Sequence, residues 1–468
     1  MPSATFLADK LGVREMAIFP RRQLQRMLNE LGSKLKRPGD LLARLDNKDP
    51  DQVLPAEYEL ALGWAMSQIA DVEVEPSVGG KSPDFLVEGF FPGLTSIIEV
   101  AALSDDALSG ESSMERTANL IGNFADSVRK RASDHLHFHF LEKSGYDAVQ
   151  PTGQIWGRST YYRKRLTSKQ FKLTEPHKSQ LRTWLATWPP PAPMQLSGEG
   201  TEVIITWKDY VHPMTRVFSS MPSLSHSLTD NPVYRRLKEK ERKQLKIAGP
   251  DFMRCIFLGD AGCRMLRVPA ERDATRRVVS GEEAINYFLA NSTVDLVAVF
   301  SPRRRYENSV DYRNNPRIWH VHCYDKVQRP VEFYDGLKKV AELLPSPRLH
   351  GYQARSWLRQ DMLAPQGRGQ YRSATYTSGR NRVSAKISAR AILELMAGRM
   401  TADDFRLWAL GEKNLFDHWL TLGFAISDVK FEASGSDHDD DYVIFQFEKD
   451  PNASPLELPS SMPPKDTD

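Results

Sequence analysis

The chain has 468 residues, 40% of them hydrophobic and 26% charged, and its 63 Lys and Arg against 60 Asp and Glu give a formal net charge of +3. This composition, at a length that suits roughly two to four domains, excludes disorder over the whole chain. No stretch reaches the roughly 20 apolar residues of a membrane span, residues 1–20 lack the apolar core of a secretion signal, and three cysteines are too few for a disulfide scaffold; the sequence thus predicts a cytoplasmic protein without a membrane partner.

An α/β pattern begins in the first hundred residues. Polar, basic helices are predicted over 20–49, and a helix over 55–69 follows, in which apolar residues recur at helical spacing. Three strand-like runs come next, separated by Gly-Gly and Pro-Gly turn signals, over 72–78, 84–90 and 95–103.

An irregular, basic stretch interrupts this pattern. A helix is predicted over 113–132 and a strand over 135–140, but 141–230 is long and irregular and contains a proline-rich run at 188–193. Such a composition is typical of a linker or an insertion. A further strand is predicted inside it, over 202–207.

A second α/β rhythm starts with a basic helix over 231–247. It continues with a strand over 253–259, a helix over 281–290, and strands over 295–300 and 317–324. Beyond about residue 331 helices and basic loops dominate. The elements predicted there are a helix pair over 384–398 and 401–410, a strand over 442–447 and a proline-rich tail expected to be disordered.

Acidic residues stand at informative places in this scheme. Glu57 and Glu59 lie in the first long helix, Asp84 opens a strand, and Glu99 stands inside the next, otherwise apolar strand. The 15-residue gap from Asp84 to Glu99 suits adjacent antiparallel strands joined by a short turn, which brings both carboxylates to neighbouring positions. A carboxylate inside an apolar strand is costly unless it is paired or metal-bound, and oxygen ligands suit Mg²⁺ or Mn²⁺.

The segment Pro83-Asp84, followed by Glu99-Val100-Ala101, resembles the PD-(D/E)xK nuclease superfamily, which has a helix–strand–strand–strand–helix–strand core. The resemblance covers about 60–140 of the 468 residues. It implies that Asp84 and Glu99 bind a metal ion and that a helical acid completes the site. Glu57, at the edge of the apolar stripe on a helical wheel, is preferred over Glu59 for that role.

The chain departs from the family at the motif lysine, where it has Ala101. In the family this lysine helps to position or activate the nucleophilic water and stabilises developing negative charge. Replacement from elsewhere is expected, and Lys81 stands nearest in the sequence, three residues before Asp84. The other candidates, among which the sequence does not choose, are Lys130, Lys208 and Lys243.

The basic helix over 231–247 and the apolar strand after it resemble the helix and strand that the superfamily places after its Glu-bearing strand. Residues 104–230 would then be an insertion within the core. In the alternative, 113–132 and 135–140 supply that helix and strand. We favour the insertion because the strands over 253–259 and 295–300 are the more apolar.

The expected fold is α/β, a restriction-endonuclease-like mixed-sheet core with a large insertion and a separate mixed α+β C-terminal domain. The expected parts are an N-terminal helical segment (1–50), a nuclease-like domain (51–330) with its insertion at about 141–230, a C-terminal domain (331–450) and a disordered tail (451–468).

The resemblance implies a Mg²⁺-dependent endonuclease that cleaves DNA, of the kind found in restriction or anti-phage defence systems. The alternative is a catalytically degenerate nuclease fold that serves as a nucleic-acid-binding or assembly subunit. The partners considered besides DNA are a second copy of the chain, in a homo-oligomer, and a partner protein of a defence system. The basic residues expected to grip phosphates are Arg163, Lys164, Arg165, Arg235, Arg236 and Lys243.

Two competing sites carry less weight. His135, His137 and His139 have spacing that can chelate zinc, but a strand with polar residues turned outward explains them more simply. The helix pair over 384–410 could form a helix-turn-helix, although most paired helices do not bind DNA.

Overall fold

The structure, a computed structural model, describes most of the chain. The described residues are 17–36, 38–47, 49–146, 161–209, 217–218, 224–246, 252–266, 278–304, 317–355, 358, 374–377, 382–398, 400–406, 415–433 and 441–450. The expected disordered tail over 451–468 lies outside them.

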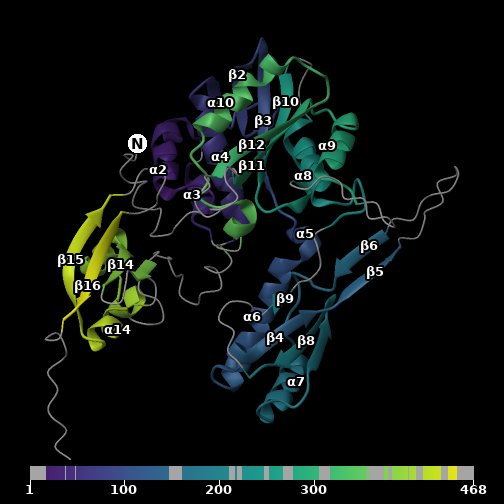
Figure 1. Ribbon diagram of the computed structural model, residues 1–468. Coiled ribbons are helices and arrows are strands. Elements are labelled where there is room, and N and C mark those ends of the chain that lie inside the picture. The colour runs from purple at the N-terminus through teal and green to yellow at the C-terminus, as the bar shows by residue number, and fades with distance from the viewer. Residues whose placement is uncertain are drawn as a thin grey trace, which may run out of the picture.

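A six-stranded mixed sheet forms the centre of the first body (Figure 1). Its strands, in spatial order, are β1 (Asp71–Val74), β2 (Phe85–Phe91), β3 (Leu94–Leu103), β10 (Phe252–Asp260), β11 (Leu296–Arg304) and β12 (Arg317–Asp325). The middle strand β10 runs parallel to both of its neighbours, and the outer pairs are antiparallel. The chain leaves β3 and returns in β10 only after the insertion, so these two core strands meet across a long crossover.

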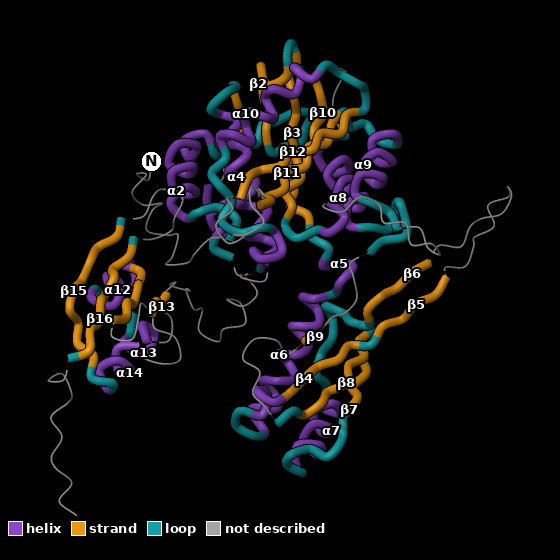
Figure 2. Tube along the Cα trace, viewed as in Figure 1, coloured by secondary structure: helices purple, strands orange, loops and turns teal. Residues whose placement is uncertain are grey.

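Helices cover both faces of this sheet (Figure 2). Because successive strand side chains point to opposite faces, Ile98 and Val100 pack in one buried cluster and Ile97 and Ala101 in the other. The first cluster is covered by α2 (Arg21–Leu31), α3 (Pro38–Leu45), α4 (Pro50–Ser67) and α10 (Asp335–Leu343). The second is covered by α8 (Pro232–Lys240), continued by a π-helical turn (Glu241–Leu245), and by α9 (Gly281–Ala290).

The first body extends beyond the boundaries expected at residues 50 and 331. Leu24 and Leu28 of α2 and Leu337 and Val340 of α10 share one buried cluster with α4 and the sheet. Helix α4 is buried around nearly its whole circumference, so it needs covering elements from both ends of the chain. The N-terminal helices and the first helix after residue 330 therefore belong to this body and not to separate units.

The insertion folds around a core of its own. Its four-stranded sheet has the order β7 (Met194–Gly198), β8 (Thr201–Trp207), β4 (Leu136–Phe140) and β9 (Val217–Phe218). Its helices are α5 (Asp106–Ser109), α6 (Glu111–Val128) and α7 (Glu175–Ala186), and β5 (Glu142–Tyr146) pairs with β6 (Tyr161–Arg165) as a separate ribbon. It thus starts right after β3, earlier than 141, and α8 and β10 rejoin the first sheet, as the insertion hypothesis predicted.

A second four-stranded sheet lies near the C-terminus, in the order β13 (Ala374–Thr377), β14 (Arg382–Ser388), β16 (Tyr442–Lys449) and β15 (Phe424–Glu432). Three short helices accompany it: α12 (Ala389–Met396), α13 (Ala402–Phe405) and α14 (Leu415–Thr421). The helix expected from residue 384 is wrong in its first turn. Val383, Ala385 and Ile387 alternate as buried strand residues, so the helix begins only after Ser388.

Four short 3₁₀ turns complete the described elements: Gly32–Lys34, Ala132–His135, Arg264–Leu266 and Val331–Tyr334. Among the helices within the described residues, none combines the length and the apolar character needed to cross a bilayer.

The close approach of α4 to β10 gives a stability prediction. Tyr58 is fully buried, its hydroxyl donates to the Asp260 carbonyl at 2.9 Å, and a Cβ on Gly259 would lie 2.4 Å from its ring atoms. We expect Gly259→Ala to lower the free energy of unfolding by about 1–3 kcal/mol, measured by urea denaturation. Gly39→Ala is the control, because a Cβ there meets nothing within 4 Å. Equal stabilities of the two variants would contradict this packing.

Candidate active site

Two carboxylates converge where β2 and β3 pair. Phe85 lies opposite Ile98, so Asp84, just before β2, lies opposite Glu99. The Asp84 N–H donates to Glu99 Oε1 at 3.1 Å, and the Val100 N–H donates to Asp84 Oδ2 at 2.7 Å. The Glu99 side chain is fully buried and lies on the sheet face that α8 covers. The convergence that the sequence spacing predicted is therefore present.

A tight turn fixes Asp84 in this place. Val78 and Lys81 pair with each other through backbone hydrogen bonds in both directions, and Gly79 and Gly80 between them have φ values of 55° and 77°. Two successive positive φ values are typical of a two-residue hairpin turn, which glycine forms without steric cost. The Asp84 carbonyl then accepts the Glu75 N–H at 2.9 Å, so the backbone is held on both sides of the turn.

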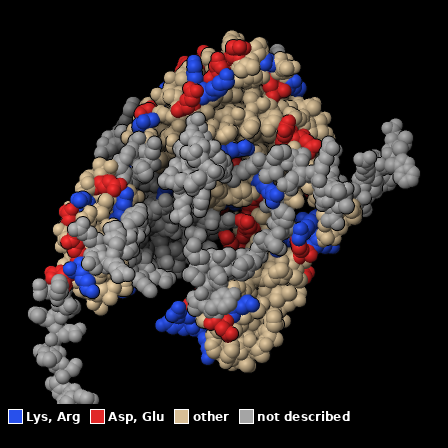
Figure 3. All heavy atoms as spheres, in the orientation of Figure 1, with Lys and Arg blue, Asp and Glu red and all other residues tan. Residues whose placement is uncertain are grey.

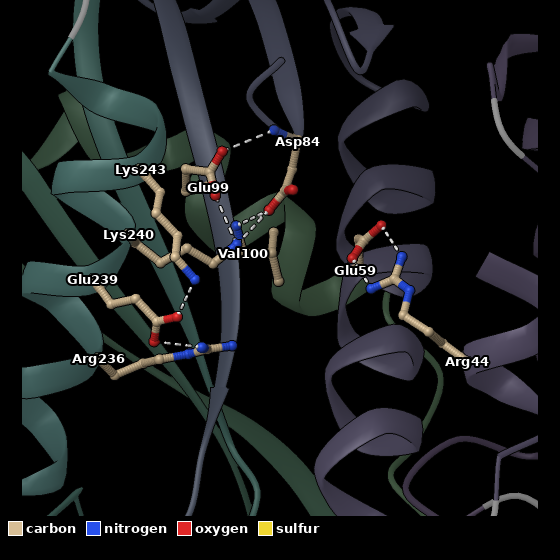
Figure 4. A network of polar contacts seen from close by, with 9 residues as sticks. All are labelled: Arg44, Glu59, Asp84, Glu99, Val100, Arg236, Glu239, Lys240 and Lys243. Carbon is tan, nitrogen blue, oxygen red and sulfur yellow. Dashed lines mark hydrogen bonds and ion pairs between the residues drawn. The ribbon is translucent and has the colours of Figure 1, made fainter. Parts of the chain in front are cut away.

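The third member of the cluster is Lys240 of α8 (Figure 4). Its Nζ lies 2.6 Å from Glu99 Oε2 and 3.2 Å from Asp84 Oδ2, and its side chain is only 16% exposed. Lys240 is the last residue of the α-helical part of α8, directly before the π-helical turn. Such π-helical turns are rare and occur frequently at functional sites.

The helix that carries Lys240 is anchored at both ends. The Asn231 side chain accepts the Tyr234 N–H and caps its start, and Val233 and Leu237 are buried against the sheet. At its far end the carboxylate of Glu241 accepts the backbone N–H of Thr293 at 2.9 Å. The position of the Lys240 ammonium group therefore follows from the packing of α8.

Burial and like charge dominate the electrostatics of the cluster. Burial, and then the neighbouring charge of Asp84, raise the pKa of Glu99 from 4.5 to about 8. Burial lowers the pKa of Lys240, but the charges of Asp84 and Glu99 outweigh it and raise that pKa above its ordinary value. Lys240 therefore keeps its charge at neutral pH, and a further positive charge beside Glu99 would favour its anion and lower its pKa.

The helical acid nearest to this cluster is Glu59, not Glu57. The Glu57 carboxylate is fully buried and accepts the backbone N–H groups of residues 17–19 at 2.8–3.0 Å, so it serves the fold. Glu59 forms two hydrogen bonds with Arg44, at 2.7 and 2.8 Å. Burial, and also the charge of Asp84, raise the pKa of Glu59, although the hydrogen bonds from Arg44 lower it. The preference for Glu57 is thus corrected.

None of the four lysines proposed as replacements reaches the carboxylates. Lys81 Nζ donates to the backbone carbonyl of Arg242 at 3.1 Å, and Lys243 Nζ donates to Glu239 at 2.6 Å. Lys130 and Lys208 belong to the insertion, which has a separate sheet and core. Lys240, the lysine that does contact both carboxylates, lies on the same helical segment as the candidate Lys243, and sequence reasoning missed it.

The expected phosphate-gripping residues differ in their availability. Arg165 is 4% exposed and donates to the Phe140 carbonyl at 3.1 Å, so it cannot grip a phosphate. Arg163 pairs with Glu142 on the ribbon, whereas Lys164 beside it is exposed. On helix α8, Arg235 pairs with Asp230, and Arg236 and Lys243 both pair with Glu239. On the face drawn in Figure 3, basic and acidic side chains of the described residues lie intermixed.

The carboxylates of Asp84 and Glu99 fit a magnesium ion that takes few ligands from the protein. Among the described residues, no group of three or more His, Cys, Asp and Glu side chains is placed to hold a metal ion. Mg²⁺ usually takes only one or two carboxylates and completes its shell with water and substrate phosphate. Asp84 Oδ1 accepts no hydrogen bond from any described residue, so Asp84 and Glu99 could supply such a pair.

The histidines expected to turn outward from one strand lie in different surroundings. His137 is buried in β4, His139 is exposed, and His135 precedes the strand and stacks on Trp207 with ring centroids 4.2 Å apart. His137 and His139 alternate with the core residues of β4 and so lie on one face of the strand, but only His139 is exposed there.

Comparisons with known proteins add no family. No family model matches the chain, and neither the curated proteins nor the solved structures give a significant match.

The raised pKa of Glu99 gives a pH prediction. Between about pH 4.5 and 8 the folded protein holds a proton that the unfolded chain releases. The folded state binds more protons there, so the contribution of Glu99 to the free energy of unfolding falls as pH rises. We expect the wild type to lose stability relative to Glu99→Gln by up to about 1.4 kcal/mol per pH unit across this window, in urea titrations with EDTA. Parallel pH profiles of the two proteins would contradict the shift.

Proposed function

We propose that this protein is a Mg²⁺-dependent endonuclease of the PD-(D/E)xK type that cleaves DNA, with Lys240 in place of the missing motif lysine. The observation that carries the proposal is the ammonium group of Lys240, which contacts a carboxylate from each of two paired strands, at 2.6 and 3.2 Å. Activity on DNA in a restriction or anti-phage setting stays a prediction from the resemblance.

The order of the core elements supports this proposal. Along the chain, α4 is followed by β1, β2 and β3, and, after the insertion, by α8 and β10. This is the helix–strand–strand–strand–helix–strand order of the superfamily that Pro83-Asp84 and Glu99 resemble. The two carboxylates lie on the paired strands β2 and β3, and the lysine lies on the helix that leads into the next core strand.

The energetics also favour a functional role for the cluster. A buried ion pair or triad is often no more stable than apolar side chains of the same volume, so the fold gains little from having three charges here. Strongly shifted pKa values concentrate at functional sites. Asp84 and Lys240 keep 20% and 16% of their side chains exposed, so a substrate phosphate can approach from solvent.

The residues of this chain would divide the chemistry as follows. Asp84 and Glu99 would hold the metal ion through their oxygens. When bound, Mg²⁺ supplies an activated water and neutralises charge on the phosphodiester. Lys240 would place a fixed positive charge beside the phosphorus, where negative charge develops in the transition state. Because the carboxylates already hold its ammonium group, this charge needs no rearrangement during the reaction.

The second candidate is a degenerate nuclease fold that binds nucleic acid without cutting it. One observation favours it, namely that the helical acids are both engaged elsewhere. Glu57 binds backbone N–H groups and Glu59 binds Arg44. Of the acids that the resemblance assigns to the metal site, Asp84 and Glu99 are then left to hold the ion.

Cleavage assays on plasmid and linear DNA with Mg²⁺ or Mn²⁺ test the proposal. We expect Asp84→Asn, Glu99→Gln and Lys240→Met each to reduce the cleavage rate at least about 100-fold, because each removes a group that contacts the reacting phosphate or its metal ion. Lys339→Met is the control, since it removes the same charge from an exposed position of α10, on the sheet face opposite to the cluster. Circular dichroism checks that each variant is folded.

Two results would contradict the proposal in different ways. If Lys240→Met cuts DNA as fast as the wild type while Asp84→Asn is inactive, the role assigned to Lys240 is contradicted. A wild type that binds DNA but cuts under neither metal would favour the non-enzymatic candidate.

A further inference from the structure

A pocket of about 510 Å³ opens next to the cluster, among α4, the end of β3 and the start of α8. Arginines gather in its lining: Arg44, Arg235, Arg236 and Arg355, with the carboxylates of Asp51 and Glu239. The proposed nuclease chemistry assigns no role to these four guanidinium groups, and the packing of the core does not need them around one pocket. The pocket is therefore a candidate binding site in its own right.

The pocket and the cluster share two elements, β3 and α8, and the pocket also borders α4, which carries Glu59. Arg236 in the pocket lies four residues before Lys240 on α8, and Pro55 in the pocket lies four residues before Glu59 on α4. Residues four apart on a helix lie on one face, roughly 6 Å apart along the axis. The β3 residue Ala102, also in the lining, comes three residues after Glu99. A ligand in the pocket therefore lies about one helical turn from the reactive groups.

The pocket carries surplus positive charge after its ion pairs are counted. Arg44 pairs with Glu59 and Arg235 with Asp230, outside the lining. The two carboxylates in the lining have further cations, because Lys243 contacts Glu239 and Lys169 lies near Asp51. Among the described residues these are six positive groups and four carboxylates, so the positive groups outnumber the carboxylates by two.

Two of the arginines also have hydrogen-bond donors without an acceptor among the described residues. Arg355 is 3% exposed, and its Nη1 donates to Asp51 at 2.7 Å, but its Nη2 has no hydrogen-bond partner among the described residues. The buried Nε of Arg236 likewise lacks a partner within the described part of the chain. A buried donor without an acceptor costs free energy, and an anion in the pocket would remove that cost once the guanidinium group turns this donor toward it.

We infer that this pocket binds a phosphomonoester, either the phosphorylated end of a nucleic acid strand or a free mononucleotide. A phosphomonoester carries roughly −1.5 to −2 charges at neutral pH, which matches the surplus of two, whereas each phosphodiester carries one. The planar donors of arginine fit phosphate oxygens, and both α4 and α8 present their N-terminal ends to the pocket. Its volume is that of a small-ligand site.

A bound strand end has a consequence for cleavage, which rests on the proposed function. With its terminal phosphate held one helical turn away, the strand would run toward Lys240 and present a bond near its end to the cluster. Cleavage would then favour DNA with phosphorylated ends over the same DNA with hydroxyl ends.

Binding without metal tests the pocket separately from the nuclease activity. Fluorescence anisotropy in EDTA measures how tightly the full-length protein binds three oligonucleotides of the same sequence. One carries a 5′-phosphate, one a 3′-phosphate, and one has hydroxyl groups at both ends. We expect one phosphorylated form to bind at least about tenfold more tightly than the hydroxyl form, as charge-assisted hydrogen bonds allow. Competition with 5′-AMP separates the sources: full displacement at low concentration assigns the site to a mononucleotide, and weak displacement assigns it to a strand end.

Matched variants locate the effect. Arg236→Gln should abolish the preference, and Arg235→Gln, at an exposed position, should weaken it if Arg236→Gln fails to fold. Arg242→Gln removes the same charge from the π-helical turn outside this pocket and should keep the preference. Equal binding of all three oligonucleotides without binding of 5′-AMP, or equal losses in Arg236→Gln and Arg242→Gln, would overturn the inference. If the protein prefers phosphorylated ends but never cuts DNA, the pocket proposal is supported and only the nuclease proposal is contradicted.

Discussion

The contact of one ammonium group with two carboxylates joins three elements of the first body. Lys240, Asp84 and Glu99 come from three different elements, and the carboxylates repel each other at this distance unless a cation or a proton intervenes. Each element is therefore fixed independently: the Gly79-Gly80 turn holds Asp84, the buried strand β3 holds Glu99, and α8 holds Lys240. The architecture accommodates a costly arrangement that its own packing does not require.

The long insertion fits into this scheme without disturbing it. It departs after β3 and returns at α8, in the crossover that joins the parallel strands β3 and β10, and it carries its own buried cluster. That cluster does not include residues of the six-stranded sheet, so the insertion has a core separate from the two that flank the sheet. The arginine-lined pocket lies on the first body, beside the point where the chain departs and returns.

Strand periodicity made two of the three residues of the cluster predictable, namely its carboxylates. The spacing of Asp84 and Glu99 around a turn sets their register, and period-two alternation puts both on one sheet face. Lys240 was missed, although a signal exists: it follows Val233 by seven residues and Leu237 by three, which puts a lysine in the apolar stripe of its helix. A helical wheel could not show whether Glu57 or Glu59 faces the two carboxylates, because α4 is buried on nearly all sides and has no single apolar stripe. Contacts across the chain, such as Glu57 with residues 17–19, leave no local trace in the sequence.

The most direct measurement is the titration of the Glu99 carboxyl group by NMR on protein labelled with ¹³C at its glutamate side chains, with Glu99→Gln to assign the signal. In the metal-free wild type, a pKa near 8 is expected, and Lys240→Met should raise it further because the nearby ammonium group lowers it. Added Mg²⁺ should lower it, because a cation between the carboxylates favours the anion. A pKa near 4.5 that neither Lys240→Met nor Mg²⁺ changes would contradict the buried cluster and the metal site built on it.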